Sequence, residues 1–464
     1  MRKHAIENEN PGLYAKREMW RRYSDLYAGG EQFRIRAADY LIQRHKEPVA
    51  IYYERLSRVF YENYVGSIID WFAATLLRRE PVVQFNGDDN YGKRFFAQFI
   101  QDCDQKGTTL SDFFRRQITD TLVYGKSYMV VDFPRVLSHV ANRAEEDAAG
   151  MSQAYLTSYL PEQVTNWGKT PQGEFEWVVL KTESVHQPSP GAEPLHETVW
   201  TYYDRDTYEI YRREGPLDAA SEITLTDSGP HGLASQRRVP IFELTTPDGL
   251  WLMNKAALLQ LEHFNKSNAL AWALTMGLFA MPVVYSDKPF QETVGESYYV
   301  QMGQGDRFGW AEPEGRVYSL AADNLDRLKD EIYRVCYLLS QAGKSDSGGL
   351  PQSGLSKQMD FSVTQEILLA YGDLVKSTMR QIMQAIALAR RDDLQVDVSG
   401  LDEFDVGEFS SELADAKAFL ALGIESKTLK QQMFKKLAFK YLSDSRQEIK
   451  NKISQEIDAS VTDA

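Results

Sequence analysis

Apolar residues recur with a helical period in three long stretches of the chain. Residues 49–79 place one at every fourth position, which predicts a single strong helix with one apolar stripe: Leu56, Phe60, Tyr64, Ile68, Phe72 and Leu76. Residues 323–342 space theirs alternately three and four apart, a heptad-like seam that predicts packing along a neighbouring helix: Leu325, Leu328, Ile332, Val335 and Leu339. Residues 356–391 predict a helix about 50 Å long at ~1.5 Å per residue, which is long for a compact monomer and predicts packing against something external.

Shorter helical stretches come with local stop signals. Residues 14–27 predict a helix that ends before Gly29 and Gly30, and residues 250–276 return to helical periodicity. Residues 108–124 predict a helix for which Gly125 is placed as a left-handed cap, and an apolar strand at 127–134 follows at once. Helix, glycine and strand together indicate a packed α/β unit.

Alternating apolar and polar residues predict two groups of strands. Residues 158–167, 174–185, 197–213 and 237–244 are rich in aromatic and β-branched side chains, which favours an antiparallel sheet with loops at 187–195 and 213–236. The second group, 282–317, consists of four short segments separated by Gly, Pro and Asp turns: PVVYSD, SYYVQMG, DRFGWAE and GRVYSL. It predicts a small β-rich insert between two helices.

A soft loop separates the last two long helices. Residues 343–354, GKSDSGGLPQSG, contain four Gly, three Ser and a single large apolar side chain, Leu350. Connections between helices are usually ~2–8 residues long. By sequence alone an ordinary surface loop and a functional one are both compatible with this stretch.

The last part of the chain alternates short helices and turns, at 413–424 and 426–439, with Ser426 placed as an N-cap. The second of these helices is rich in lysine, which leaves a helix-turn-helix DNA reader open as an alternative. Because acidic residues flank these lysines, a plain helical hairpin is favoured.

The net charge of −14 argues against a free, tight nucleic-acid binder, although it does not exclude a protein that lets nucleic acid pass without holding it. Two cysteines, Cys103 and Cys336, are too few for a disulfide framework and indicate a reducing compartment. The most apolar stretch, 269–284, is shorter than the ~20 residues that span a bilayer, so we expect no membrane contact.

Enzyme motifs are incomplete. GKT at 168–170 has Gln163 where a phosphate-binding loop needs glycine, and HETVW at 196–200 lacks the second histidine of a zinc-protease helix, so we predict a hairpin turn and a strand. GQGDRFG at 303–309 has the wrong glycine spacing for a dinucleotide fold. Isolated histidines such as His139 and His263 are more typical of surface or helix polar positions than of ligands. We therefore expect no catalytic site, no metal and no cofactor.

Four stretches, in this order, resemble the portal proteins of tailed bacteriophages, including a portal-like family formerly known as a phage domain of unknown function. They are WRRYSDLYAGGEQFR (20–34), YYERLSRVFYENYVGSIIDWFAATLLRREPVV (52–83), LVYGKSYMVVDFP (122–134) and YLPEQVTNW (159–167). Arg44 departs from the family pattern, which has a proline after YL, and this puts a turn at the edge of the wing in doubt.

The resemblance implies an α+β portal fold with an α/β wing, two stem helices that bracket a β-rich clip, a tunnel loop, a long kinked helix and a helical crown. Its implied parts are the wing (1–250), first stem helix (251–276), clip (277–322), second stem helix (323–342), tunnel loop (343–355), long wing helix (356–391) and crown (392–464).

The soft loop then corresponds to the tunnel loop at the narrowest part of a DNA channel, where Lys344 could touch phosphates: Gly343, Lys344, Ser345, Asp346, Ser347, Gly348, Gly349, Leu350, Pro351, Gln352, Ser353 and Gly354. Candidate channel-facing basic residues in the stem helices are Lys266, Lys329 and Arg334. Twelve subunits of −14 would give −168, an acidic wall that repels DNA phosphates.

The implied function is a homo-oligomeric, dodecameric ring at one vertex of the virion capsid, assembled in the host cytoplasm. Double-stranded DNA passes through it during packaging and ejection. Its expected partners are further copies of itself, the terminase large subunit at the clip, the head–tail adaptor, and the major capsid and scaffold proteins. Two alternatives stay open: another phage head protein without a channel, and a soluble hydrolase with an unrecognised site.

Overall fold

The computed structural model contains helices and sheets in two compact units, an α+β fold. It describes residues 6–134, 150, 152–187, 189–191, 193–215, 222–277, 281–285, 305, 307–311, 315–338, 354–402, 404, 416–421, 426–442 and 447–462. Unit 1 comprises Met1–Ser24, Ile68–Asn254 and Gln352–Ala464, and unit 2 comprises Asp25–Ser67 and Lys255–Pro351.

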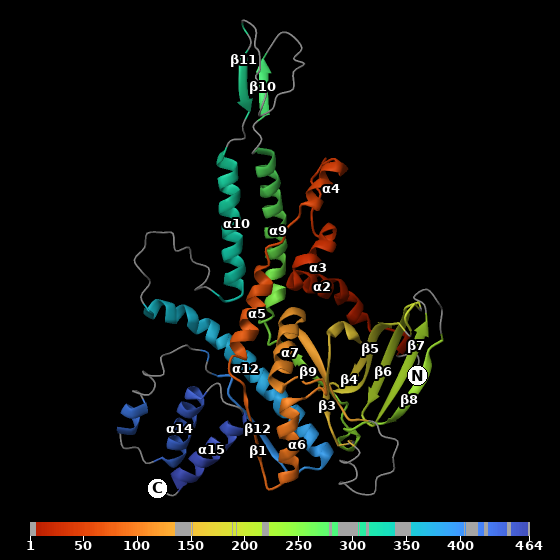
Figure 1. Ribbon diagram of the computed structural model, residues 1–464, viewed down its shortest axis with the longest axis vertical. Coiled ribbons are helices and arrows are strands. Elements are labelled where there is room, and N and C mark those ends of the chain that lie inside the picture. The colour runs from red at the N-terminus through yellow and green to blue at the C-terminus, as the bar shows by residue number, and fades with distance from the viewer. Residues whose placement is uncertain are drawn as a thin grey trace. The chain divides into compact units, whose positions relative to one another are not determined.

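A five-stranded antiparallel sheet in unit 1 contains the predicted strands 174–185 and 197–213 and the second half of 158–167 (Figure 1). Its order follows the chain: β4 (Val164–Lys169), β5 (Phe175–His186), β6 (Leu195–Asp204), β7 (Thr207–Gly215) and β8 (Thr224–Pro230). The prediction is wrong for 237–244, which pairs with another sheet as β9 (Ile241–Thr245). The predicted loop at 213–236 is wrong where β8 lies. This edge strand is exposed almost throughout, so no apolar alternation marks it, and backbone pairing with β7 alone makes it a strand.

A three-stranded sheet of unit 1 has β2 (Lys126–Asp132) between β3 (Tyr155–Tyr159) and β9 (Ile241–Thr245). The preceding helix α7 (Leu110–Tyr124) begins at the Thr109 cap, and Gly125 ends it with φ of 84°, the left-handed conformation that the sequence predicts. Gly125 N–H donates to the Thr121 carbonyl at 2.9 Å. The helix–glycine–strand unit is therefore confirmed.

The long helix α12 (Gly354–Arg390) confirms the predicted one to within two residues at each end. Its apolar stripe is buried in unit 1: Ile367, Tyr371, Val375, Met379, Ile382 and Ile386. The helix thus packs within its own chain along this stripe, and the prediction that it needs an external surface is wrong for this face. The strand β12 (Gln395–Ser399) after it pairs with β1 (Val82–Asn86), a pairing of segments far apart in sequence.

Unit 1 also contains most of α2 (Pro11–Ala28), most of α5 (Tyr64–Leu76), α6 (Asn90–Gln101), α14 (Lys427–Tyr441) and α15 (Gln447–Thr462). Ser426 caps α14 as predicted, since its hydroxyl accepts from Leu429 N–H at 3.3 Å. The predicted hairpin of 413–424 with 426–439 includes the undescribed residues 422–425 and stays a prediction. Helix α14 contacts α15, since Lys435 pairs with Asp458 at 2.6 Å.

Unit 2 contains α3 (Gly30–Ile35), a turn of 3-10 helix at Ala37–Asp39, α4 (Val49–Ser57), the start of α5 (Tyr64–Leu76), most of α9 (Leu252–Gly277), the β10–β11 hairpin (Met281–Tyr285 and Arg307–Ala311) and α10 (Gly315–Val335). Helix α9 confirms the prediction for 250–276.

The single helix predicted for 49–79 is wrong, because α4 and α5 are separate helices. Asn63 begins α5, since its side chain accepts from Gly66 N–H at 2.8 Å and donates to the Tyr27 carbonyl at 2.8 Å. Just before it, the backbone of Phe60 bonds to the side chain of Asn268 rather than to a helical neighbour. Both contacts are tertiary, so the four-residue period continues across a break that it does not reveal.

Both ends of the predicted second stem helix differ from the observed bounds of α10 (Gly315–Val335). The segment GRVYSL, predicted as a strand of the insert, lies in the first turns of α10, where Tyr318 donates to the Ala273 carbonyl at 3.3 Å. The helix ends at Val335 instead of 342. Leu338 N–H donates to the Tyr333 carbonyl at 2.9 Å while Tyr337 is left-handed at φ of 63°, which is a Schellman ending without glycine.

Candidate nucleic-acid interface

Helices α9 and α10 lie antiparallel in unit 2, with the β10–β11 hairpin beyond one end of the pair (Figure 1). Two side-chain contacts fix this register: Lys255 donates to the Tyr337 hydroxyl, and Lys266 donates to the Asn324 side chain at 2.9 Å. Within the predicted seam of α10, Leu328 and Ile332 are buried and Leu325 and Val335 are half-buried. The heptad-like spacing therefore identified the packing face of this helix.

The three basic residues predicted to face a channel occupy different environments. Lys266 is exposed and also pairs with Glu262 at 2.9 Å. Lys329 is half-buried, with its ammonium 5.8 Å from the centre of the Tyr64 ring. Arg334 is exposed and binds Glu331 through two hydrogen bonds. The structure does not gather these three residues on one face, and their contact with DNA stays a prediction.

Two exposed arginines of α10, Arg316 and Arg327, were missed by sequence reasoning, and they form a row with the predicted Arg334. Arg316, Arg327 and Arg334 are all exposed, and their spacings of 11 and 7 residues are close to three and two helical turns, so they share one face over about 27 Å. Arg316 and Arg327 form no hydrogen bond or ion pair with the described residues. The 11 and 7 spacing was the available signal, but Arg316 lay in a segment predicted as a strand.

Side-chain amides of α9 hold the backbone of the segment before α5. A carboxamide can donate and accept at the same time, so one side chain can bracket a peptide group. The Gln260 amide accepts from Val65 N–H at 3.3 Å and donates to the Glu62 carbonyl at 2.8 Å. The Asn268 amide accepts from Phe60 N–H at 3.2 Å and donates to its carbonyl at 2.9 Å. These brackets fix residues 60–65 on the buried side of α9.

His263 lies between these brackets with only 3% of its side chain exposed. Its Nδ1 lies 3.6 Å from a Glu62 oxygen and has no hydrogen-bond partner in the described part of the chain. Burial lowers the pKa of His263, and the nearby Glu62 carboxylate opposes that shift. Because its pKa is lowered, the His263 imidazole is neutral at pH 7. The adjacent Tyr64 has a pKa raised to about 12, chiefly by burial.

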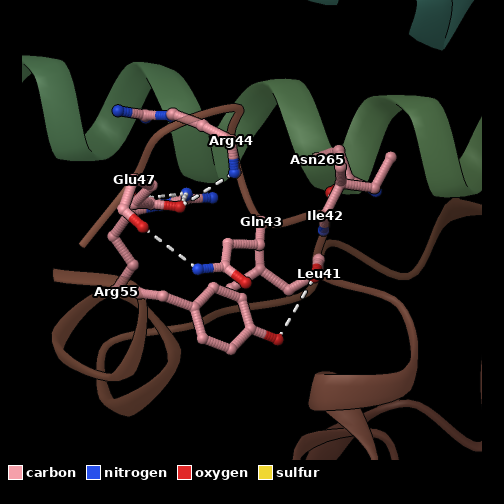
Figure 2. A network of polar contacts seen from close by, with 8 residues as sticks. Leu41, Ile42, Gln43, Arg44, Glu47, Arg55 and Asn265 are labelled. Carbon is pink, nitrogen blue, oxygen red and sulfur yellow. Dashed lines mark hydrogen bonds and ion pairs between the residues drawn. The ribbon is translucent and has the colours of Figure 1, made fainter. Parts of the chain in front are cut away.

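A second polar network fixes residues 41–57, which we call the α4 arm (Figure 2). Arg55 donates to both oxygens of Glu47 at 2.7 and 2.8 Å, and each side chain is only 4% exposed. Arg44 N–H donates to the same carboxylate at 3.0 Å. Burial alone would raise the pKa of Glu47, but these bonds lower it, so the carboxylate is ionised at pH 7. A proline at position 44 has no N–H and could not make this bond.

The start of the α4 arm is attached to α9 by a third amide bracket (Figure 2). Asn265 donates to the Tyr40 carbonyl at 3.0 Å and accepts from Ile42 N–H at 2.9 Å. Tyr52 of α4 connects the helix to the start of the arm, since its hydroxyl donates to the Leu41 carbonyl at 3.3 Å. The arm thus has a fixed position on α9.

The candidate tunnel loop lies outside the described residues, apart from Gly354, the first residue of α12. His139 also lies outside them. Gly168 and Lys169 of the GKT stretch are the last residues of β4, so the predicted hairpin turn begins only at Thr170. HETVW lies in β6, as predicted.

A groove of about 710 Å³ lies in unit 1, where β1, β12 and α14 line it with charges of both signs. In the described part of the chain, no three His, Cys, Asp or Glu side chains are grouped so as to hold a metal ion. Cys103 and Cys336 are free and buried. No described helix combines the length and apolar character that crossing a bilayer requires.

Comparison with known proteins gives no family match and no match among curated proteins. Among solved structures, a chain from the neck of an empty gene transfer agent particle is 12% identical with a TM-score of 0.44, covering 80% of this chain and 90% of that chain. A chain from the virion of a native gene transfer agent particle has the same identity and TM-score over 86% and 98%. A chain from the neck of the native particle is 12% identical with a TM-score of 0.38 over 77% and 84%. Because these TM-scores lie below 0.5, we base no inference on the similarity.

Proposed function

We propose that this chain is a portal subunit: copies assemble into a ring at one capsid vertex, and the α9–α10 pair lines the channel through which double-stranded DNA passes. The observation that carries the proposal is the antiparallel α9–α10 pair with a β-hairpin between the two helices and an exposed arginine row along α10. A helix pair with one packing face, and one exposed face on which Asp323 and Glu331 accompany the arginines, suits a channel wall that does not hold the duplex.

The charges support passage of DNA rather than tight binding. In a ring, Arg316, Arg327 and Arg334 would form cationic rings about 16 and 10 Å apart along the helix. Arginine contacts to phosphates carry no sequence information, so any DNA could pass. The remaining surface belongs to a chain of net charge −14, which opposes retention of the duplex. The spacing between the arginine rings would then determine where weak, repeated contacts to the duplex occur.

We further propose that the subunit has no catalytic role and that a separate ATP-hydrolysing terminase drives translocation while docked on the β10–β11 hairpin. The head–tail adaptor would occupy the same end after packaging. The incomplete phosphate-binding motif at 168–170, which lies at the end of β4, supports this division of labour.

Electron microscopy of the purified full chain tests the ring, and a packaging assay tests the channel. We expect rings with a central hole wide enough for a DNA duplex. The double variant Arg316→Ala/Arg327→Ala is expected to form rings but to lower the nuclease-protected DNA per particle. The matched control is Arg34→Ala, an exposed arginine of α3 paired with Glu31. A chain that stays a single copy even when co-produced with the other virion proteins would refute the proposal.

A further inference from the structure

The α4 arm presents an exposed apolar and basic surface. Ile42, Val49 and Tyr53 are 67%, 62% and 62% exposed, and all three lie within one twelve-residue stretch of the arm. Val49 and Tyr53 lie four residues apart on α4, so they share one face of that helix. The opposite side of the arm carries the buried Arg55. The arm therefore has an inner face that packs on unit 2 and an outer apolar face.

The tip of the arm adds positive charge beside this apolar face. Arg44, His45 and Lys46 are exposed, and none of their side chains forms a hydrogen bond or ion pair with the described residues. No acidic residue lies between 42 and 46, so the tip carries +2 while the whole chain carries −14. Lys46 is left-handed at φ of 62°, a conformation that fixes the turn between the tip and α4. The basic tip thus belongs to an otherwise acidic protein.

The arm is held rigid by contacts that a simple surface loop would not need. Burying an ion pair is unfavourable unless its geometry is good and its remaining bonding positions are filled. The Glu47 carboxylate meets that condition through Arg55 and the Arg44 N–H, whereas Arg55 Nε is buried without a hydrogen-bond partner among the described residues. Asn265 adds the bracket to α9 (Figure 2). A surface that is ordered before binding loses less entropy when it docks. These contacts hold tip and apolar face in one arrangement.

We propose that the α4 arm docks on an acidic surface of a second copy of this chain, an inference that rests on the proposed ring. Charge complementarity carries the choice of partner, because a +2 tip meets a chain of net charge −14 in every neighbouring copy. Two arms would repel each other, so the contact joins unlike surfaces. Contacts of that kind close into rings when the rotation allows. DNA is the less suitable partner, since phosphate contacts would leave Ile42, Val49 and Tyr53 exposed.

The test is zero-length carbodiimide cross-linking of the full chain. An equal mixture of ordinary and ¹⁵N-labelled protein is cross-linked after assembly and analysed by mass spectrometry. We expect Lys46 to be joined to an Asp or Glu of a differently labelled copy. Cross-links from Lys46 that join only equally labelled peptides would overturn the inference.

Variants give an independent readout by the concentration at which assembly begins. Arg44→Glu/Lys46→Glu and, separately, Tyr53→Ser are expected to raise that concentration roughly 30-fold, as loss of a central interface residue does. Tyr441→Ser, which changes a tyrosine 72% exposed on α14, is the matched control and should leave it unchanged. Arm variants that assemble like the unaltered chain overturn the inference, and so do variants that lose only binding of a DNA duplex.

The two proposals fail in different ways. Rings that form without the arm contact would leave the portal proposal intact and overturn the docking inference. Assembly through the arm into closed pairs, without rings, would support the docking surface and overturn the portal proposal.

Discussion

Replacing Glu47 with alanine tests whether the buried ion pair holds the α4 arm in place. The substitution removes both bonds to Arg55, at 2.7 and 2.8 Å, and the bond from Arg44 N–H at 3.0 Å. It leaves the Arg55 guanidinium in a site that is 4% exposed, without a counter-charge. The unpaired cation then favours any state in which the arm opens to water.

Removing one partner of a buried pair costs about 3–5 kcal/mol. We take the lower end, about 3 kcal/mol, because opening of the arm alone returns the guanidinium to water without unfolding α9. At ~1.4 kcal/mol per factor of ten, the population of the open arm rises roughly 100-fold. Helix α9 keeps its own core contacts, so we expect the change to be confined to residues 41–57.

Amide hydrogen exchange measures this population directly. The amides of Ile51 and Tyr52, which donate to the Pro48 carbonyl at 3.0 and 3.1 Å, should exchange roughly 100-fold faster in Glu47→Ala. The control is Glu54→Ala in the same helix, whose pair with Arg58 is exposed and 3.3 Å long and contributes about 1 kcal/mol or less. Equal exchange rates in the two variants would refute the view that burial makes the Glu47–Arg55 pair important.

Two further predictions concern the cores of the two units. Burial lowers the pKa of His263 below its ordinary 6.5, so the unfolded chain binds a proton more readily than the folded chain. The free energy of unfolding therefore falls as the pH drops below 6.5. Thermal melts at about pH 7.5 and 5.5 should show this loss, and His263→Gln should reduce it. In unit 1, Gly125→Ala places a Cβ 2.9 Å from the Trp251 ring at a left-handed position, so urea titration should show the free energy of unfolding lowered by more than ~2 kcal/mol. The control Gly173→Ala is also left-handed but its Cβ has nothing within 4 Å, and it should lower that free energy by about 1 kcal/mol. Equal losses in the two glycine variants, or a pH effect that His263→Gln leaves unchanged, would contradict these expectations.

The sequence predicted elements well wherever the signal is local. The α7–Gly125–β2 unit follows from an apolar period, a glycine able to adopt positive φ and an apolar strand, all within 23 residues. The stripe of α12 was equally clear, because six apolar residues at helical spacing leave one face to be buried. The candidate basic residues were less certain, since helical period alone does not tell which exposed face of α10 carries charge.

The sequence by itself determined the α+β composition, the antiparallel sheet, the order of the long helices and the acidic character, because each depends on residue type and on spacing within one element. Only the tertiary structure decided where the 49–79 period breaks, since the Asn268 side chain that binds Phe60 lies 208 residues away. It alone also buried the Glu47–Arg55 pair, whose two residues lie eight positions apart in the sequence. The residue type of a charged or amide side chain does not reveal whether that side chain is solvated or buried. Its role depends on its partners, and only the fold brings those partners together.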